Sequence, residues 1–478
     1  MARAERSLIL GMAGWLASVP ATAAAPFDGL YTGTIACEAS GASPGFSQAV
    51  AFVLQGGRFI SEKGVAGQRN YERMAVGVTA DGALTIEGRY WADIEKPIRY
   101  EGRVAGGRMH AEGPRGPRRC VLDAAAPPPS GATRPYRAAP DVAARRALIG
   151  KPGDAAFACP EPPAPVRDVK VEPFYQKGDP THSIVDPAAY EARRQAAAPF
   201  DKLAAGIARL GDRYIKASPR DPKLAACLFG WMETWAAAGA MLGEVTHQGA
   251  YERKWTLTTL SLNYALLADA PEIGPERRRA VEAWFAAIAW ATIPYYAAKP
   301  FAEQNNHLNW AALAALSTGV AVQDAGLVDW SVAALKGVIG SNIDADGSLP
   351  HELKRASKAT HYHRFALEPL AVAAEIAAAN GIDLYAVGDG ALHRLVAYTA
   401  AAMRDPDIVA RRVNVAQSVV GADAIKPSMW DWAEPYAARF PGKTELAATL
   451  KDLRGKGLFS AWAGGDMTLR FGPAGGGL

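Results

Sequence analysis

The hydrophobic repeat of this chain changes from two residues to 3.6 residues near position 140, which limits the folds it can adopt. Over residues 27–122, apolar and polar residues alternate, and glycine-containing pairs separate the short runs. This pattern is typical of antiparallel β-hairpins. Further along, apolar residues recur at helical spacing, as at Val281, Trp284 and Ile288. The sequence therefore predicts a multidomain protein, with a small antiparallel β domain (a sandwich or a half-closed barrel) followed by an all-α domain.

The turns and helices can be placed in more detail. Hairpin turns are expected at Gly56-Gly57, Asp81-Gly82 and Gly106-Gly107. Predicted helices cover Ala197–Ile215, Leu224–Leu242, Trp255–Leu267, Val281–Ile288, Asn309–Val322, Trp330–Ile339, Leu367 to a stop at Asn380-Gly381, Ala391–Met403 and Glu445–Leu453. Only Met467–Phe471 has strand character in this region. Many consecutive amphipathic helices without a fixed-length sequence repeat favour a closed toroid over an extended array.

The N-terminus carries a targeting pattern. Arg3 and Arg6 precede the apolar stretch Leu8–Val19, and small residues continue to Ala25. We interpret residues 1–25 as a secretory signal peptide, because the apolar stretch is short for a membrane anchor. The mature protein is then expected to be periplasmic or secreted, without membrane insertion. Residues 26–123 form the predicted β domain, 124–140 a Pro- and Ala-rich linker, and 141–478 the helical domain.

Charge and cysteine usage narrow the partners and the compartment. The formal net charge of +4 favours an anionic partner. No dense basic run with interleaved aromatics and no zinc-knuckle spacing is present in the sequence, so nucleic acid is not expected. Four cysteines in an oxidising compartment allow three disulfide pairings. A bridge between Cys37 and Cys120 would join the first and last predicted strands of the β domain.

One segment places polar groups where a helix begins. Gln304-Asn305-Asn306-His307 precedes an apolar helix, and amides with an imidazole can hold a carboxylate or polarise a carbonyl. In the plainer interpretation, Asn305 caps the helix and His307 is an ordinary residue of its first turn.

A second segment, residues 349–362, is rich in basic and aromatic residues. Arg355 and Tyr362 are seven residues apart, so in a continuous helix they would share one face. Arginine is a bidentate partner for a carboxylate, and a nearby cation favours a phenolate. In the plainer interpretation, this segment is a solvated helix start with a buried tyrosine.

Together the two segments resemble the mannuronate-specific alginate lyases of polysaccharide lyase family 5, over roughly Cys159 to Phe471. The resemblance implies an incomplete (α/α) toroid and a reaction that requires no metal or other cofactor. The family's catalytic residues fall on Asn306, His307, Arg355 and Tyr362. Its substrate-binding positions fall on Gln176, Lys177, His247, Gln248, Trp310 and Lys358. Its disulfide falls on Cys159 and Cys227, which leaves Cys37 with Cys120.

The chemistry that this resemblance implies is β-elimination on an anionic uronate polysaccharide, which gives unsaturated oligosaccharides. Arg355 and Asn306 would hold the sugar carboxylate. Tyr362, as a phenolate or relaying through His307, would remove the C5 proton, and the sequence leaves open which of the two is the base. Phe365 stands where the family usually has a tyrosine. The substrate could therefore be the mannuronate linkages of alginate, acetylated mannuronan, mixed alginate or a polyglucuronate.

Two other classes of function remain open at this stage. A glycoside hydrolase would need two carboxylates across the scissile bond, and Glu352 has no evident partner. A non-catalytic polymer-binding or export protein would use the β domain for interaction. The β domain has no counterpart in the standard family, and we consider three roles for it: carbohydrate binding, docking, and a stabilising cap.

Overall fold

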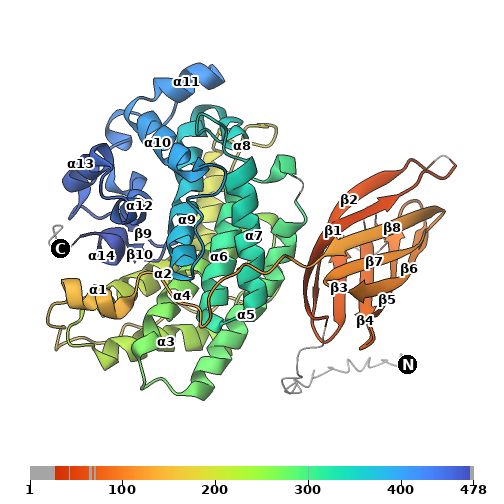
Figure 1. Cartoon of the computed structure of the whole chain (residues 1–478), viewed down its shortest axis with the longest axis horizontal. Helices are drawn as coiled ribbons and strands as arrows, with labels where there is room; N and C mark the ends of the chain where they lie inside the picture. The colour runs from red at the N-terminus through yellow and green to blue at the C-terminus, as the bar shows by residue number, and fades with distance from the viewer. Residues whose placement is uncertain (1–26, 42, 64–66, 69–70, 300, 474–478) are drawn as a thin grey trace, which may run out of the picture.

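The computed structural model describes residues 27–41, 43–63, 67–68, 71–299 and 301–473. The predicted signal peptide, residues 1–25, lies outside these ranges. A β-sheet part and a larger helical part lie side by side, as Figure 1 shows. No helix in the described ranges combines the length and the apolar character needed to cross a membrane.

The N-terminal part is an eight-stranded antiparallel sheet with the order β2-β1-β8-β7-β6-β5-β4-β3. The two edge strands, β2 and β3, are consecutive in the chain and are joined at one end by a hairpin turn that contains Gly56-Gly57. The sheet therefore curls into a half-closed barrel, and all three predicted turns are confirmed. The strands are β1 Gly29–Cys37, β2 Phe46–Leu54, β3 Arg58–Lys63, β4 Glu72–Val78, β5 Ala83–Trp91, β6 Glu95–Ala105, β7 Arg108–Arg115 and β8 Arg118–Ala125.

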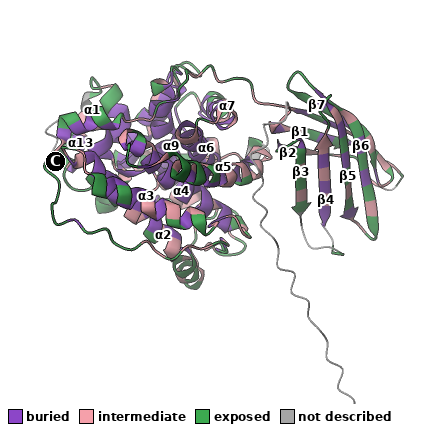
Figure 2. Ribbon diagram, turned by 90° about the horizontal axis from the view of Figure 1, so that it is seen from below, coloured by how far each residue is buried: buried purple, intermediate pink, exposed green. Residues whose placement is uncertain are grey.

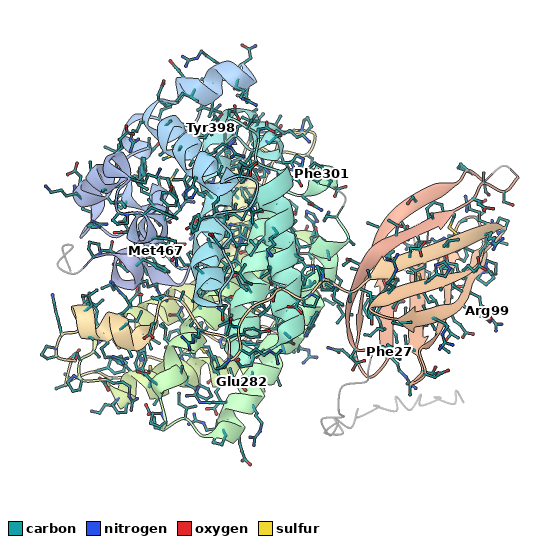
Figure 3. All side chains as sticks on the ribbon, in the orientation of Figure 1. Phe27, Arg99, Glu282, Phe301, Tyr398 and Met467 are labelled. Atoms are coloured by element: carbon teal, nitrogen blue, oxygen red, sulfur yellow. A yellow bond between two sulfur atoms is a disulfide. The ribbon has the colours of Figure 1, made fainter. Side chains whose placement is uncertain are left out.

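Side chains alternate along each strand, so that apolar residues fill the barrel and charged residues lie on its outer surface. Ile86, Tyr100 and Leu122 point inward and are fully buried, while Arg99 extends outward from β6 (Figure 3). Cys37 and Cys120 are directly paired across β1 and β8 and form a disulfide. This bridge fixes the pairing between the first and the last strand of the β part along the chain.

The helical part consists of inner and outer helices. The inner helices α2, α4, α6 and α9 are neighbours in that order, and α3, α5, α7 and α10 pack outside them. Buried residues concentrate in the inner layer, as Figure 2 shows for α6 and α9. The helices are α1 Val142–Ile149, α2 Pro187–Lys216, α3 Pro222–Ala237, α4 His247–Tyr264, α5 Pro275–Ala297, α6 Asn306–Val322, α7 Ala325–Ser341, α8 Pro350–Leu353, α9 Ala359–Ala379, α10 Ala391–Arg404, α11 Asp407–Val413, α12 Ala433–Arg439, α13 Thr444–Leu453 and α14 Met467–Phe471.

The structure corrects several predicted boundaries. Helix α2 begins ten residues before Ala197, because Asp186 caps it and Pro187 occupies its first turn. Helix α4 begins at His247 and not at Trp255, since Thr246 caps its first turn and the polar residues Gln248, Glu252 and Lys254 are buried. Helix α3 ends at Ala237, short of the predicted Leu242.

The predicted strand at Met467–Phe471 was wrong, because this segment is helix α14, capped by Asp466. The buried guanidinium of Arg145 donates to the carbonyls of Thr468, Leu469 and Gly472 at the end of this helix. Two short strands, β9 Phe459–Ser460 and β10 Gly465–Asp466, precede it and form a small hairpin.

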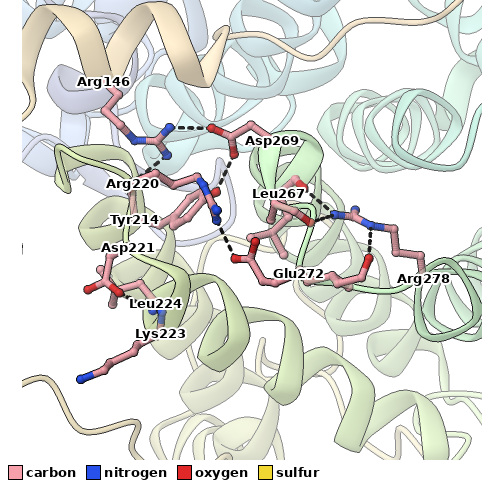
Figure 4. A network of polar contacts seen from close by, with 12 residues as sticks. Arg146, Tyr214, Arg220, Asp221, Lys223, Leu224, Leu267, Asp269, Glu272 and Arg278 are labelled. Atoms are coloured by element: carbon pink, nitrogen blue, oxygen red, sulfur yellow. Dashed lines mark hydrogen bonds and ion pairs between the residues drawn. The ribbon is translucent and has the colours of Figure 1, made fainter.

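Helix α1 is attached to the inner layer through a polar network, drawn in Figure 4. Arg146 of α1 pairs with Asp269, and Asp269 also accepts a hydrogen bond from Tyr214 of α2. Burial, reinforced by the neighbouring Asp269 carboxylate, raises the pKa of Tyr214 to about 12. Tyr214 therefore acts as a permanent hydrogen-bond donor that joins α2 to the segment after α4.

The segment between β8 and α1 has linker composition but is bound to the helical part along its length (Figure 1). The side chain of Gln323 makes two hydrogen bonds to the backbone of Tyr136, and Asn380 does the same to Arg137. Tyr136 is itself buried in the helical core. We call residues 126–141 the strap.

The two parts also share apolar packing. Strand β2 contacts α5 and β1 contacts α7. Leu30 and Val53 belong to the core of the helical part and not to the interior of the barrel. The outer face of the β1–β2 hairpin is apolar because it packs against the helical part and is not exposed to solvent.

We expect Val53→Asp to lower the free energy of unfolding by about 3 kcal/mol, because it places a carboxylate in this apolar contact. Ile60→Asp is the matched control, since Ile60 lies in β3, the next strand along the chain, and is 59% exposed. It should change stability by less than about 0.5 kcal/mol. Urea unfolding monitored by tryptophan fluorescence measures both. Equal losses from the two variants would contradict the packing described here.

Candidate active site

The N-terminal ends of the four inner helices border one cavity of about 800 Å³. Tyr190 from α2, His247 from α4, His307 from α6 and Tyr362 from α9 all lie in the first or second turn of their helices and line this cavity. Helix N-termini carry unpaired N–H groups and partial positive charge, so their convergence favours an anion. The loop before α2 and Trp462 from the β9–β10 hairpin complete the wall.

Charged side chains in the wall are strongly biased toward cations. The six lysines and arginines are Arg193, Lys299, Lys354, Arg355, Lys358 and Arg364, whereas Glu303 is the sole carboxylate among the lining residues. Three of these cations pair with carboxylates: Arg193 with Glu252, Lys299 with Glu303, and Arg364 with Asp431. Lys354, Arg355 and Lys358 have no carboxylate partner within the described residues. These three are available to an anionic ligand.

Arg355 and Tyr362 are in contact, although not through the continuous helix that their spacing predicts. Helix α8 ends at Leu353, and α9 begins only at Ala359. Between them Ala356 has a φ of +46°, a conformation that side-chain-bearing residues rarely adopt. This break lays the Arg355 guanidinium over the Tyr362 ring, 3.7 Å from its centroid.

Gln417 holds this strained turn in place. Its amide nitrogen donates to the carbonyl of Ala356, and its amide oxygen accepts from the backbone N–H of Thr360. The Thr360 N–H lies in the first turn of α9, where the helix itself supplies no acceptor for it. A buried side chain from a distant loop therefore fixes the position of Arg355 relative to Tyr362.

The Tyr362 hydroxyl lies 2.6 Å from the Tyr175 hydroxyl, and Lys358 Nζ lies 3.5 Å from the same Tyr175 hydroxyl. Burial raises the pKa of Tyr362 well above its usual value, and the Arg355 cation opposes this effect. If Tyr175 donates in this hydrogen bond, two groups stabilise the phenolate form of Tyr362. The Arg355 guanidinium lies on its ring face, and the Tyr175 hydroxyl donates to its oxygen.

His307 is held by stacking and by one buried partner. Its ring stacks on Tyr251, with centroids 3.6 Å apart, and its Nδ1 lies 3.2 Å from Lys254 Nζ. Burial and then the Lys254 cation lower the pKa of His307 well below its usual value, so the ring is neutral at neutral pH. Asn305 caps α6 and accepts from the backbone N–H of His307, so the capping interpretation also holds.

Asn306 does not line the cavity. It is fully buried, and its backbone N–H and side-chain amide both donate to Glu352 Oε1. Burial raises the pKa of Glu352. The direct contact predicted between Asn306 and a substrate carboxylate stays a prediction, although Asn306 is not among the residues that line the cavity and one N–H of its side-chain amide is bonded to Glu352. Through these hydrogen bonds to Glu352, Asn306 links α6 to α8.

The other predicted binding residues divide into two groups. His247, Gln248 and Lys358 line the cavity. Gln176 and Lys177 are exposed on the loop and do not line it, because the neighbouring Tyr175 occupies that position.

Trp310 was also predicted to bind substrate, and it too lies outside the wall. It is completely buried and donates its indole N–H to the carbonyl of Phe365. Helix α6 turns this side chain into the core, so Trp310 supports the wall from behind.

Several lining residues were missed from the sequence. Tyr251 and Trp255 follow His247 at intervals of four, which places all three on one face of α4. This spacing was visible in the sequence, but it could be used only if the helix was known to start at His247. Trp462, which stacks on Trp255 at 4.4 Å, comes from a distant hairpin and has no local signal.

Comparison with known proteins gives consistent matches over the helical part. The family model for alginate lyases matches residues 170–409. A polysaccharide lyase from Stenotrophomonas maltophilia is 34% identical over 318 residues, which cover 65% of this chain and 90% of that protein. An alginate lyase from Azotobacter vinelandii is 33% identical over 66% of this chain and 85% of its own length.

Solved structures agree with the sequence matches. Alginate lyase A1-III from a Sphingomonas species superposes with a TM-score of 0.57 and 27% identity, over 69% of this chain and 94% of that one. A histidine-to-alanine variant of the same lyase, complexed with a tetrasaccharide, superposes with a TM-score of 0.61 and 26% identity, over 72% and 95% of the two chains. The strands β1–β8 precede the span that the family model matches.

We expect Glu352→Leu to destabilise the protein by about 3 kcal/mol, because it leaves two buried donors of Asn306 unpaired. Glu352→Gln is the control, since it keeps an acceptor oxygen of the same shape, and it should cost about 1 kcal/mol. Urea unfolding measures both. The assignment of a structural role to Glu352 is wrong if the two variants are equally stable.

Proposed function

The chain belongs to the alginate lyase family, polysaccharide lyase family 5, and from this premise we propose that it cleaves the mannuronate linkages of alginate by β-elimination. The observation that carries the proposal is the contact of Arg355 with Tyr362 in a cavity whose unpaired charges are all cationic. A uronate polymer carries one carboxylate on each sugar, so it supplies the anions that this wall lacks.

The reaction begins at C5 of the uronate. Removal of the C5 proton builds negative charge on the adjacent carboxylate as the enolate-like species forms. Arg355 can hold the carboxylate through a two-pronged contact, with Lys358 nearby in the same wall. Donors that are fixed before the reaction stabilise developing charge at little reorganisation cost.

Tyr362 is our candidate for the proton transfers. As a phenolate it would take the C5 proton, and as a phenol it would then protonate the departing O4. Arg355 over its ring and a hydrogen bond from Tyr175 both favour the phenolate, against the burial that raises the pKa of Tyr362. His307, neutral and in the same cavity, is the alternative base or the group that relays the proton.

Hydrolysis of a glycosidic bond receives no support from this cavity. That reaction needs two carboxylates, one on each side of the bond. Among the described lining residues, Glu303 is the sole acid, and it is paired with Lys299. Glu352 is fully buried beside Asn306 and does not line the cavity.

We further propose that the protein is exported to the periplasm or secreted. The basic and apolar N-terminal stretch supports this proposal, as do the two disulfides, Cys37–Cys120 and Cys159–Cys227. Such bonds persist in oxidising compartments, where a polysaccharide substrate would also be met.

Tyr362→Phe should lower kcat on polymannuronate by about 10²–10⁴-fold, since it removes only the hydroxyl that exchanges protons. Tyr398→Phe is the matched control, because it removes a buried hydroxyl outside the cavity that has no hydrogen-bond partner among the described residues. The ultraviolet absorbance of the unsaturated product reports the rate. Wild-type protein that gives no such signal on polymannuronate, polyguluronate or polyglucuronate would contradict the proposed function.

Arg355→Lys should lower kcat/KM by about 10²-fold, although it keeps the charge, because lysine lacks the planar fork that binds a carboxylate at two points. Arg439→Lys is the control, since Arg439 pairs with Glu375 away from the cavity. The same absorbance assay applies. An unchanged rate in Arg355→Lys would mean that Arg355 does not hold the carboxylate in the transition state.

A further inference from the structure

Lys254 is a buried cation in an unusual setting. Its side chain is 0% exposed, yet its Nζ has no carboxylate partner among the described residues. Glu252, two residues earlier, instead accepts from Arg193 and Gln248. A buried ammonium without a counter-charge costs several kcal/mol, so its retention requires a reason.

The partner that Lys254 does have is His307. Lys254 Nζ lies 3.2 Å from His307 Nδ1, which is hydrogen-bond distance for one donor and one acceptor. The ring faces of Tyr251, Trp255 and Tyr296 surround Nζ, with centroids 4.3, 4.2 and 5.2 Å away. Aromatic faces attract an ammonium group and replace part of its lost hydration.

Two positive charges on this buried pair are disfavoured. Burial lowers the pKa of both groups, and each cation would further disfavour the other. An isolated lysine binds its proton about four pKa units more tightly than an isolated histidine. A single shared positive charge therefore belongs on Lys254.

We propose that Lys254 is a positioning residue, which donates a hydrogen bond to His307 Nδ1 and thereby keeps the imidazole neutral with its proton on Nε2. An ammonium group has no lone pair, so Nδ1 must be the acceptor and the single proton of the neutral ring must sit on Nε2. The stack on Tyr251 fixes the plane of the ring. The hydroxyl of Tyr251 is in turn 2.9 Å from His247 Nε2, which anchors the stack.

This arrangement determines what His307 can offer to a ligand. With Nδ1 occupied by Lys254, Nε2 is the ring nitrogen that remains for the cavity, and it is a donor. His307 would then give a hydrogen bond to a uronate carboxylate beside Arg355. It could not accept the C5 proton at Nε2, so of the two candidate bases Tyr362 would remain. This consequence rests on the proposed function, whereas the protonation of the ring does not.

The direct test is ¹⁵N NMR of the full-length protein labelled at histidine, because protonated and unprotonated ring nitrogens resonate in separate ranges. The His307 signals are those lost in His307→Ala. In the wild type we expect a neutral ring with the proton on Nε2. A wild-type ring with its proton on Nδ1, or a doubly protonated ring at neutral pH, overturns the proposal.

Lys254→Met removes the ammonium and keeps most of the side-chain volume. We expect His307 to lose its single tautomer and kcat/KM on polymannuronate to fall by about 10–100-fold. Arg253→Met is the matched control, because it removes another buried cation of α4 that bonds to the carbonyl of Ala291 and does not line the cavity. It should leave the His307 spectrum unchanged.

A Lys254→Met protein that keeps the wild-type His307 spectrum would show that Lys254 does not set the tautomer. If Lys254→Met does not fold, the wild-type spectrum still decides the protonation state. Failure of the wild type to cleave any uronate polymer would refute the proposed function and leave the NMR result standing, so the two failures are distinguishable.

Discussion

Four inner helices run in the same direction, because each is separated from the next by an outer helix that returns the chain, and their positive ends therefore meet at one place. Unbalanced, this convergence would be unfavourable. The protein offsets part of it with buried acids: Glu252 pairs with Arg193, Glu352 accepts the first backbone N–H of α6, and Asp431 pairs with Arg364. In the cavity wall these acids do not neutralise all of the positive charge. A polyanion would neutralise the remainder.

Much of the architecture follows from local patterns in the sequence. The β-hairpins were predictable because glycine pairs specify their turns, and the outer helices because their apolar stripes are visible. The inner helices are harder, since both sides of α4 and α6 are buried and their polar residues are paired inside the protein. This is why His247 and Tyr251 were not assigned to a helix, although they carry much of the cavity wall.

In the candidate site, too, some features could be predicted from the sequence and others could not. His307, Arg355 and Tyr362 were selected from two short segments and line one cavity, as a shared reaction would require. The geometry that joins Arg355 to Tyr362 was not predictable, because it depends on the left-handed Ala356 and on Gln417 from a remote loop. Trp310 was misassigned because sequence alone does not say which face of a buried helix borders a cavity.

The strap and the shared core have a consequence for how the molecule loses its structure. Domains joined by a free linker usually melt one at a time, each with its own transition. Here Tyr136 of the strap and Val53 of β2 are packed into the helical core, so neither part can unfold without exposing apolar surface of the other. The unfolding of the barrel and that of the helical part are thus thermodynamically coupled. The barrel therefore stabilises the helical part against unfolding, in addition to any role of its charged outer surface.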